Sequence, residues 1–246
     1  MKFTNQMKKI VKLKNCPNFR TLGGYTCMGG KVTGEGKLFR AACLSKLSEN
    51  DIYVLKSMNI LTVIDLRTCI EIEQAKNPVC EDNSFAYINI PLTPDARTPG
   101  KSELMPESLL QLYTDIADYK QMELEQIFRV IISAGSAIVF HCSAGKDRTG
   151  VVAALLLLLA GVSADEIVED YAVSYELMKP IFEYQFSENF KHVPKPPLYL
   201  MYSEPDNMRQ FLSYVKEKYR SAEEYFSCIG FNMNEISQLK KVIIGE

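Results

Sequence analysis

The stretch Val139-Phe-His-Cys-Ser-Ala-Gly-Lys-Asp-Arg-Thr-Gly150 decides the fold class. A short apolar strand is predicted over residues 137–140, and the apolar run 151–160 predicts a helix that is buried on every side. In open α/β sheets, ligands bind beyond the carboxyl ends of the strands. Backbone N–H groups converge where such a loop enters a helix, so residues 141–148 are predicted to bind an anion.

Strands and helices alternate along the rest of the chain. Residues 60–66 form a continuous apolar and β-branched run, which is typical of a strand buried on both faces. This alternation predicts an α/β fold with a mostly parallel central sheet flanked by helices. Further strands are predicted over 37–40 and 85–90, and helices over 48–59, 107–117, 122–132 and from 163 onward.

One domain is expected over residues 1–246, with residues 175–246 as a C-terminal helical extension. Tyr and Phe side chains gather between Tyr175 and Phe190. We favour the packing of an amphipathic helix for this segment, and a cover over the 141–148 loop is the alternative. Prolines between His192 and Pro205 interrupt any helix there.

Composition excludes several classes of protein. Twenty-eight basic and 30 acidic residues give a net charge of −2, so no basic field attracts nucleic acid or an anionic membrane. Seven cysteines without a C-x-x-C pair, and only two histidines, predict neither a disulfide framework nor a metal site. No transmembrane segment is expected, because the apolar run 151–162 is shorter than the about 20 residues that span a bilayer. Without a signal-peptide pattern the expected location is cytoplasmic, and secretion by another route is left open.

The loop carries residues suited to nucleophilic attack on phosphorus. Helix and amide dipoles at Cys142 are expected to favour its nucleophilic thiolate. Arg148, six residues later, can donate two parallel N–H bonds to phosphate oxygens, and of the seven cysteines only Cys142 has an arginine at this spacing. Gly145 permits the backbone turn, and Thr149 offers a hydroxyl near the thiolate. The predicted phosphate ligands in the loop are Ser143, Ala144, Gly145, Lys146 and Thr149.

The sequence His141-Cys-Ser-Ala-Gly-Lys-Asp-Arg-Thr-Gly150 resembles the signature loop of cysteine-based phosphatases. Its Lys-Asp pair is similar to atypical bacterial tyrosine and dual-specificity phosphatases, which also accept phosphoinositides. The resemblance extends to Asn18-Phe-Arg-Thr-Leu-Gly-Gly-Tyr25, Leu38-Phe-Arg-Ala41, Val63-Ile-Asp-Leu-Arg67 and Tyr219-Arg-Ser-Ala-Glu-Glu-Tyr225, nearly the whole chain. It implies the tyrosine-phosphatase-like α/β fold, a phosphocysteine intermediate, no metal and no cofactor.

The general acid is the main departure from the larger family. The chain contains no tryptophan, so the usual Trp-Pro-Asp loop is absent. Asp147 is the preferred acid because the loop fixes its position, and Asp95, which follows a predicted strand, is the alternative. Lys146 is expected to add a positive charge at the floor or rim of the pocket, which would suit a second phosphate on the substrate.

Supporting roles are predicted for several charged residues near the loop. His141 is expected to hold the loop rather than to shuttle protons. Asp65 and Arg67 form either a simple salt bridge at the end of a strand or a support for the loop. Arg20 and Arg40 are interpreted as ordinary surface charge in preference to ligands of backbone carbonyls or of a second anion.

Four functions are compatible with these residues. The preferred one is a phosphatase that acts on phosphotyrosine and also on phosphoserine, phosphothreonine or phosphoinositides. Its expected partners are then a phosphorylated protein or a phosphoinositide as substrate, and it is expected to bind free phosphate or sulfate. A phosphate-binding protein without turnover, or a phosphoinositide-selective phosphatase, is the alternative. A rhodanese-like or arsenate-reductase-like thiol enzyme is disfavoured because the loop has no second cysteine.

Overall fold

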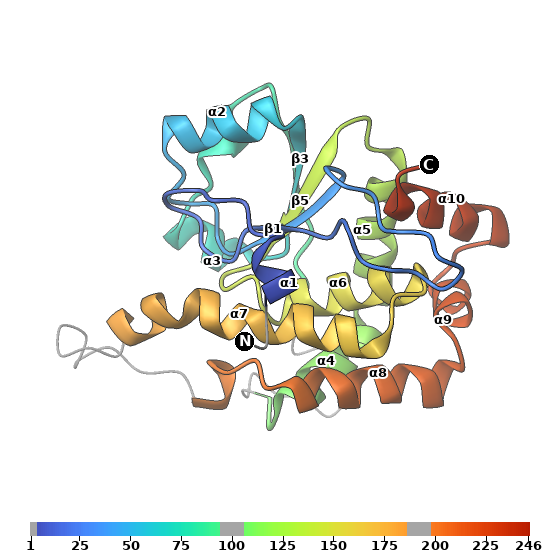
Figure 1. The fold of residues 1–246 in the computed structure, drawn as a ribbon. Coiled ribbons are helices and arrows are strands. Elements are labelled where there is room, and N and C mark those ends of the chain that lie inside the picture. The colour runs from blue at the N-terminus through green and yellow to red at the C-terminus, as the bar shows by residue number, and fades with distance from the viewer. Residues whose placement is uncertain (1–3, 94–105, 186–197) are drawn as a thin grey trace.

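The central sheet has five strands in the order β1-β2-β5-β3-β4 (Figure 1). The structure is a computed structural model that describes residues 4–93, 106–185 and 198–246. Strand β1 runs antiparallel to β2, and all the other pairings are parallel, which confirms the predicted α/β class. The strands are Arg20–Thr21, Leu38–Ala41, Ile60–Asp65, Ala86–Asn89 and Ala137–His141, numbered β1 to β5 in chain order.

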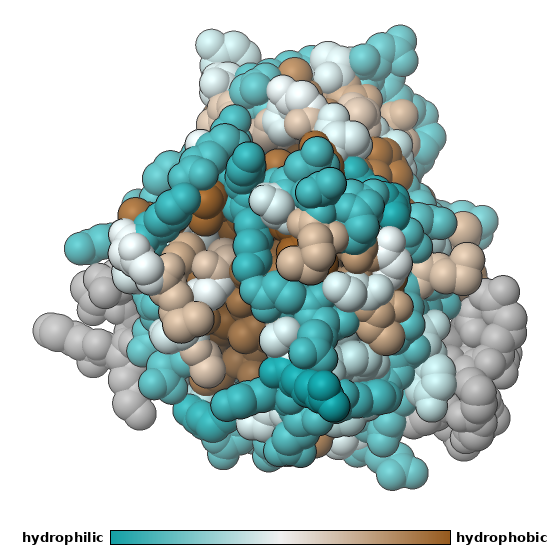
Figure 2. All heavy atoms as spheres, turned by 90° about the vertical axis from the view of Figure 1, so that its right-hand side faces the viewer, coloured by the Kyte–Doolittle hydropathy of each residue, from teal (hydrophilic) through white to brown (hydrophobic). Residues whose placement is uncertain are grey.

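Helices cover both faces of this sheet (Figure 1). One face packs against α2 and a small core cluster, while the other faces a large cluster built from helices α4 to α10. Figure 2 looks onto the side that carries α9 and α10, where the surface is mostly hydrophilic and apolar side chains show only between polar ones. The helices are α1 (Thr4–Met7), α2 (Glu49–Ser57), α3 (Cys69–Gln74), α4 (Leu109–Tyr119), α5 (Gln121–Ser133), α6 (Arg148–Leu159), α7 (Ala164–Gln185), α8 (Pro205–Tyr219), α9 (Ala222–Cys228) and α10 (Met233–Ile244), with short 3-10 turns at Pro78–Glu81 and Leu198–Leu200.

The central strand β5 shows how the sequence forms this core. Its side chains alternate, since Ile138 and Phe140 enter the large cluster whereas Ala137 and Val139 enter the small one. Both neighbours of β5 run parallel to it, and parallel sheets are covered by helices on both faces. The side chains of residues 137–140 in β5 are therefore apolar on both faces of the sheet. The apolar run that follows becomes α6, of which nearly every residue is buried. These two buried elements hold the 142–147 loop between them.

The C-terminal helices pack into this same core. Phe211 of α8, Phe226 of α9 and Leu239 of α10 all belong to the large cluster. In the part of the chain that the structure describes, no helix is long and apolar enough to cross a membrane. Asp95, His192 and residues 186–190 of the Tyr- and Phe-rich segment lie outside the described residues.

Candidate active site

The 142–147 loop joins β5 to the N-terminus of α6. Cys142 is buried at its start. Asp147, the residue that precedes α6, makes no side-chain capping bond, so the first amides of the helix remain available to a ligand. Gly145 has a φ of +65°, and a Cβ there would lie 2.3 Å from the carbonyl oxygen of Ala41. Only glycine fits this position of the loop.

Donors from the N-terminal segment hold the carbonyl groups of the loop. Asn18 Nδ2 donates to the carbonyl oxygens of Ala144 at 2.9 Å and Gly145 at 3.0 Å, and Arg40 Nη2 donates to Gly145 at 2.8 Å. The amide of Cys43 donates to the carbonyl of Ser143 at 3.0 Å. In a trans peptide the N–H points opposite to the C=O, so these bonds turn the loop amides toward the other side, where an anion would bind.

The expectation that Arg20 and Arg40 are surface charges is wrong. Both side chains are fully buried and converge on Asp170 of α7, with Arg20 Nε 2.8 Å from Asp170 Oδ1. Burial alone would raise the pKa of Asp170, but the two guanidinium groups hold it below its usual value. Asp170 also accepts a hydrogen bond from the Tyr25 hydroxyl. This buried pair of arginines with one carboxylate links β1, β2 and α7 directly behind the loop.

Replacing Asp170 with asparagine is expected to destabilise the fold by about 3–5 kcal/mol, because two buried arginines lose their counterion. The pKa of Asp170 is lower in the folded chain than in the unfolded chain. Its contribution is therefore complete above about pH 5 and is lost as the pH falls through the carboxyl range. Urea unfolding between pH 3 and pH 7 measures both effects.

The matched control is Asp82→Asn, which removes the more exposed ion pair with Lys56 and should cost no more than about 1 kcal/mol. Equal losses for the two variants, or an unchanged acid limb in Asp170→Asn, would contradict the assignment.

His141 lies between the loop and the ion pair of Asp65 and Arg67. Its Nε2 is 3.4 Å from Asp65 Oδ2, and Arg67 Nη2 is 2.7 Å from the same oxygen. Burial lowers the pKa of His141 to about 4, so the ring is neutral at physiological pH. Arg67 also donates to Cys43 Sγ at 3.0 Å. Asp65 and Arg67 therefore form a salt bridge at the end of β3, and the same Asp65 carboxylate also contacts His141 at the start of the loop. Both interpretations of this pair thus apply.

Glu71 of α3 is a site residue that the sequence patterns did not predict. Its carboxylate accepts from Arg148 Nη1 and Nη2 at 2.7 Å each, and also from the Ser143 hydroxyl. Burial would raise the pKa of Glu71, yet the bonds from Arg148 and Ser143 lower it to about 2. The two Arg148 nitrogens, Nη1 and Nη2, that were predicted to bind phosphate thus donate to the Glu71 carboxylate. Arg148 Nε has no partner among the described residues. Glu71 also completes a capping box with Thr68, which is the one signal of it in the sequence.

Lys146 was predicted to add a positive charge at the floor or rim of the pocket. The structure differs, because the Lys146 amino group is held by other groups of the protein. The side chain is fully buried, and its Nζ donates to Asp147 Oδ1 at 2.6 Å and to the carbonyl of Tyr202 at 2.9 Å. Tyr113 of α4 donates to the same Asp147 oxygen at 2.6 Å. Asp147 is 19% exposed, and its Oδ2 accepts no bond from the described residues. Lys146 and Tyr113 therefore fix one oxygen of Asp147 and leave the other without a partner among the described residues.

Thr149 contributes a buried hydroxyl to the start of α6. Its Oγ1 has no hydrogen-bond partner in the described part of the chain. Buried hydroxyls are normally paired, so an orphaned one indicates a partner that is not part of the protein or forms only at one stage of a reaction.

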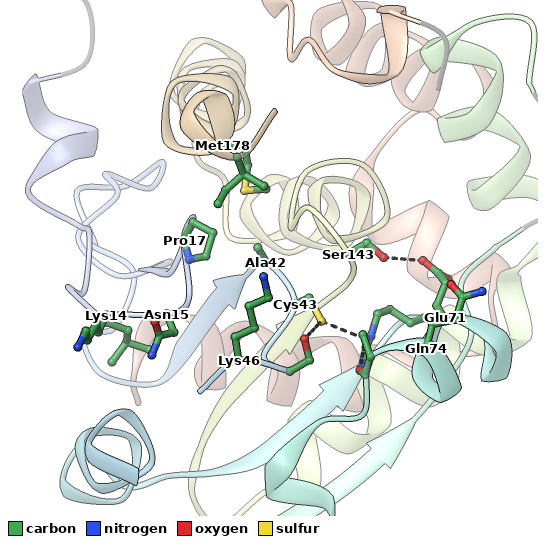
Figure 3. Close-up of a pocket in the computed structure, with 15 residues that line it drawn as sticks. Lys14, Asn15, Pro17, Ala42, Cys43, Lys46, Glu71, Gln74, Ser143 and Met178 are labelled. Atoms are coloured by element: carbon green, nitrogen blue, oxygen red, sulfur yellow. Dashed lines mark hydrogen bonds between the residues drawn. The ribbon is translucent and has the colours of Figure 1, made fainter. Parts of the chain in front are cut away.

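Beside the loop lies a cavity of about 760 Å³ (Figure 3). Ser143 and Glu71 line it on the side of the loop, and Cys43, Lys46 and Met178 come from other segments. In the close-up the Ser143 hydroxyl points at Glu71, so the cavity adjoins the carboxylate that holds Arg148.

Residues 11–245 match the tyrosine phosphatase family, and the chain belongs to this family.

Three proteins similar in sequence are tyrosine or protein phosphatases by name. A tyrosine-protein phosphatase of Nostoc commune is 31% identical over 218 residues, which are 82% of this chain and 72% of that protein. A putative tyrosine-protein phosphatase of Cupriavidus necator is 29% identical over 64% of this chain and 60% of its own length. The triple specificity protein phosphatase PtpB of Mycobacterium tuberculosis is 26% identical over 55% of this chain and 60% of its own. The crystal structure of P. aeruginosa TpbA matches with a TM-score of 0.43 at 13% identity, covering 82% of this chain and 91% of that one.

Proposed function

We propose that this protein hydrolyses phosphotyrosine in proteins through a phosphocysteine intermediate. The observation that carries the proposal is the loop itself. Its carbonyls accept hydrogen bonds from Asn18, Arg40 and Cys43, which turns its amides toward the side where a phosphate would bind, next to Cys142 and Arg148. Preorganised donors of this kind stabilise the charge of a phosphoryl group in transfer.

The reaction has two steps. In the first, the Cys142 thiolate attacks phosphorus, the bond between phosphorus and the phenolic oxygen breaks, and Asp147 gives its proton to the leaving oxygen. In the second, water attacks the phosphocysteine, the Asp147 carboxylate accepts a proton from it, and the sulfur leaves as a thiolate. We assign the stabilisation of that thiolate to the Thr149 hydroxyl, which has no hydrogen-bond partner among the described residues. Ser143, Ala144, Gly145 and Lys146 supply backbone amides to the phosphate.

Substrate scope beyond phosphotyrosine remains a proposal. The mycobacterial relative is named a triple specificity protein phosphatase, which supports more than one class of substrate. Phosphoserine, phosphothreonine and phosphoinositides are part of the proposal because the loop resembles that of phosphatases which accept them. The bonds of Lys146 to Asp147 and to the Tyr202 carbonyl argue against its use for a second phosphate. Phosphatase activity is favoured over phosphate binding without turnover because Cys142 and Arg148 are both present.

A substrate panel tests the proposal. Phosphate release from para-nitrophenyl phosphate, a phosphotyrosine peptide, the same peptide with phosphoserine, and a soluble phosphoinositide is measured with the wild-type chain. Turnover of the phosphotyrosine peptide, with inhibition by sulfate, is the expected result. Binding of phosphate without turnover of any ester would instead establish the alternative.

Replacing Arg148 with lysine is expected to lower kcat/KM for the phosphotyrosine peptide about 10²-fold, because an ammonium cannot reproduce the planar guanidinium geometry. Steady-state kinetics measures the loss. Arg129→Lys, an exposed arginine on α5, is the control and should retain activity. A nearly wild-type Arg148→Lys enzyme would show that the arginine is assigned wrongly.

A further inference from the structure

Both apolar and polar residues line the cavity beside the loop. Pro17, Ala42 and Met178 form an apolar part of its wall, together with Ile181, which is 40% exposed. Lys46, Glu71 and Ser143 present polar groups to the same cavity. Because Ser143 and Glu71 also surround Arg148, whatever enters this cavity lies directly beside a phosphate bound in the loop.

The charges that line the cavity do not cancel. Arg67 is neutralised by Asp65, and Glu71 by Arg148. Lys46 and Lys14 form no ion pair with any described residue. In the close-up the Lys46 side chain extends into the middle of the cavity, between Pro17 and Cys43, while Lys14 lies at its outer edge (Figure 3). The cavity therefore holds an uncompensated positive charge next to an apolar wall.

We propose that this cavity is a substrate subsite that binds an acidic side chain close to the phosphotyrosine of a protein substrate, with Lys46 as its ionic partner. This inference rests on the proposed function. A peptide offers both an anion for Lys46 and apolar stem atoms for the wall of Pro17 and Met178. A phosphorylated inositol ring carries hydroxyls on all sides and fits such a wall poorly.

The test compares pairs of phosphotyrosine peptides that differ only in one residue next to the phosphotyrosine, which is glutamate in one peptide and glutamine in the other. One pair carries this residue before the phosphotyrosine and a second pair carries it after. In at least one placement the wild-type chain is expected to have a three- to fivefold higher kcat/KM, as a rough estimate, for the glutamate peptide. Lys46→Ala is expected to bring that ratio to about one, and Lys46→Glu to favour a lysine peptide instead. Raising the salt concentration should shrink the wild-type ratio, since the contact is exposed.

Lys241→Ala, an exposed lysine on α10, is the matched control and should keep the wild-type ratio. Equal kcat/KM values for both peptides in the wild-type chain would overturn the subsite. So would a preference that survives in Lys46→Ala, or a dependence on Lys46 seen only with a soluble phosphoinositide.

Peptide binding to the Cys142→Ser variant separates this inference from the proposed function. If no peptide is hydrolysed by the wild-type chain but Kd still favours glutamate through Lys46, the subsite is supported and the proposed function fails. If Kd is equal for the two peptides, the subsite is overturned whatever the turnover.

Discussion

Replacing Cys142 with serine is expected to lower kcat for phosphotyrosine peptides by at least about 10⁴-fold, because the variant has lost the nucleophile on which both steps depend. A serine hydroxyl has a pKa far above neutral, and no base in the described site replaces the thiolate. Peptide affinity should remain, since the loop amides and Arg148 are unchanged. Phosphate release measures the first effect and calorimetry the second.

Cys228→Ser is the control for this variant, because Cys228 is an exposed cysteine at the end of α9. It should keep wild-type kinetics. Activity that persists in Cys142→Ser would end the covalent mechanism, and loss of peptide binding together with turnover would point to a damaged loop instead.

Asp147→Asn is expected to slow hydrolysis of phenyl phosphate by about 10²–10⁴-fold while slowing para-nitrophenyl phosphate much less. A poor leaving group needs a proton as its bond to phosphorus breaks, whereas nitrophenolate departs readily as an anion. Asparagine keeps the size of the side chain and can still accept the bonds from Lys146 and Tyr113. The dependence of kcat on the pKa of the leaving group, in wild type and variant, is the measurement.

Asp95→Asn is the comparison that decides between the two candidate acids. If Asp95→Asn shows the dependence on leaving group and Asp147→Asn a uniform loss, Asp147 serves the structure of the loop and Asp95 is the acid. If both variants lose activity equally for all leaving groups, neither Asp95 nor Asp147 is the general acid.

Much of the fold follows from local sequence. Buried strands β3 and β5 were predicted from short apolar runs, and α6 from a run with no polar face, because each residue there is buried on whichever side it points. The predicted boundaries of α4 and α5 differ from the observed ones by one or two residues: the helix expected over 107–117 is Leu109–Tyr119, and the one over 122–132 is Gln121–Ser133. The helix expected over 151–160 begins three residues earlier, at Arg148. Capping residues and periodicity act over a few residues, so they can be read without the tertiary structure.

The loop could also be predicted from local sequence, because its functional groups lie within the ten consecutive residues 141–150. The order His-Cys-x-x-Gly-x-x-Arg places a thiol, a flexible backbone and a guanidinium around one point, whatever the rest of the chain does. The sequence by itself therefore determined the buried strands and the strand–loop–helix unit that holds Cys142 and Arg148, and it predicts an anion site there.

Only the tertiary structure decided which partners these charged groups have. Asp170 meets Arg20 and Arg40 from 150 and 130 residues away, and Glu71 meets Arg148 from 77 residues away. No local pattern encodes such pairs, so Arg20 and Arg40 resembled surface charges and Lys146 resembled a free cation. Burying a charge is costly unless an opposite charge arrives with it. That compensation depends on how α3 and α7 pack against the sheet, which is a property of the folded chain and not of any segment.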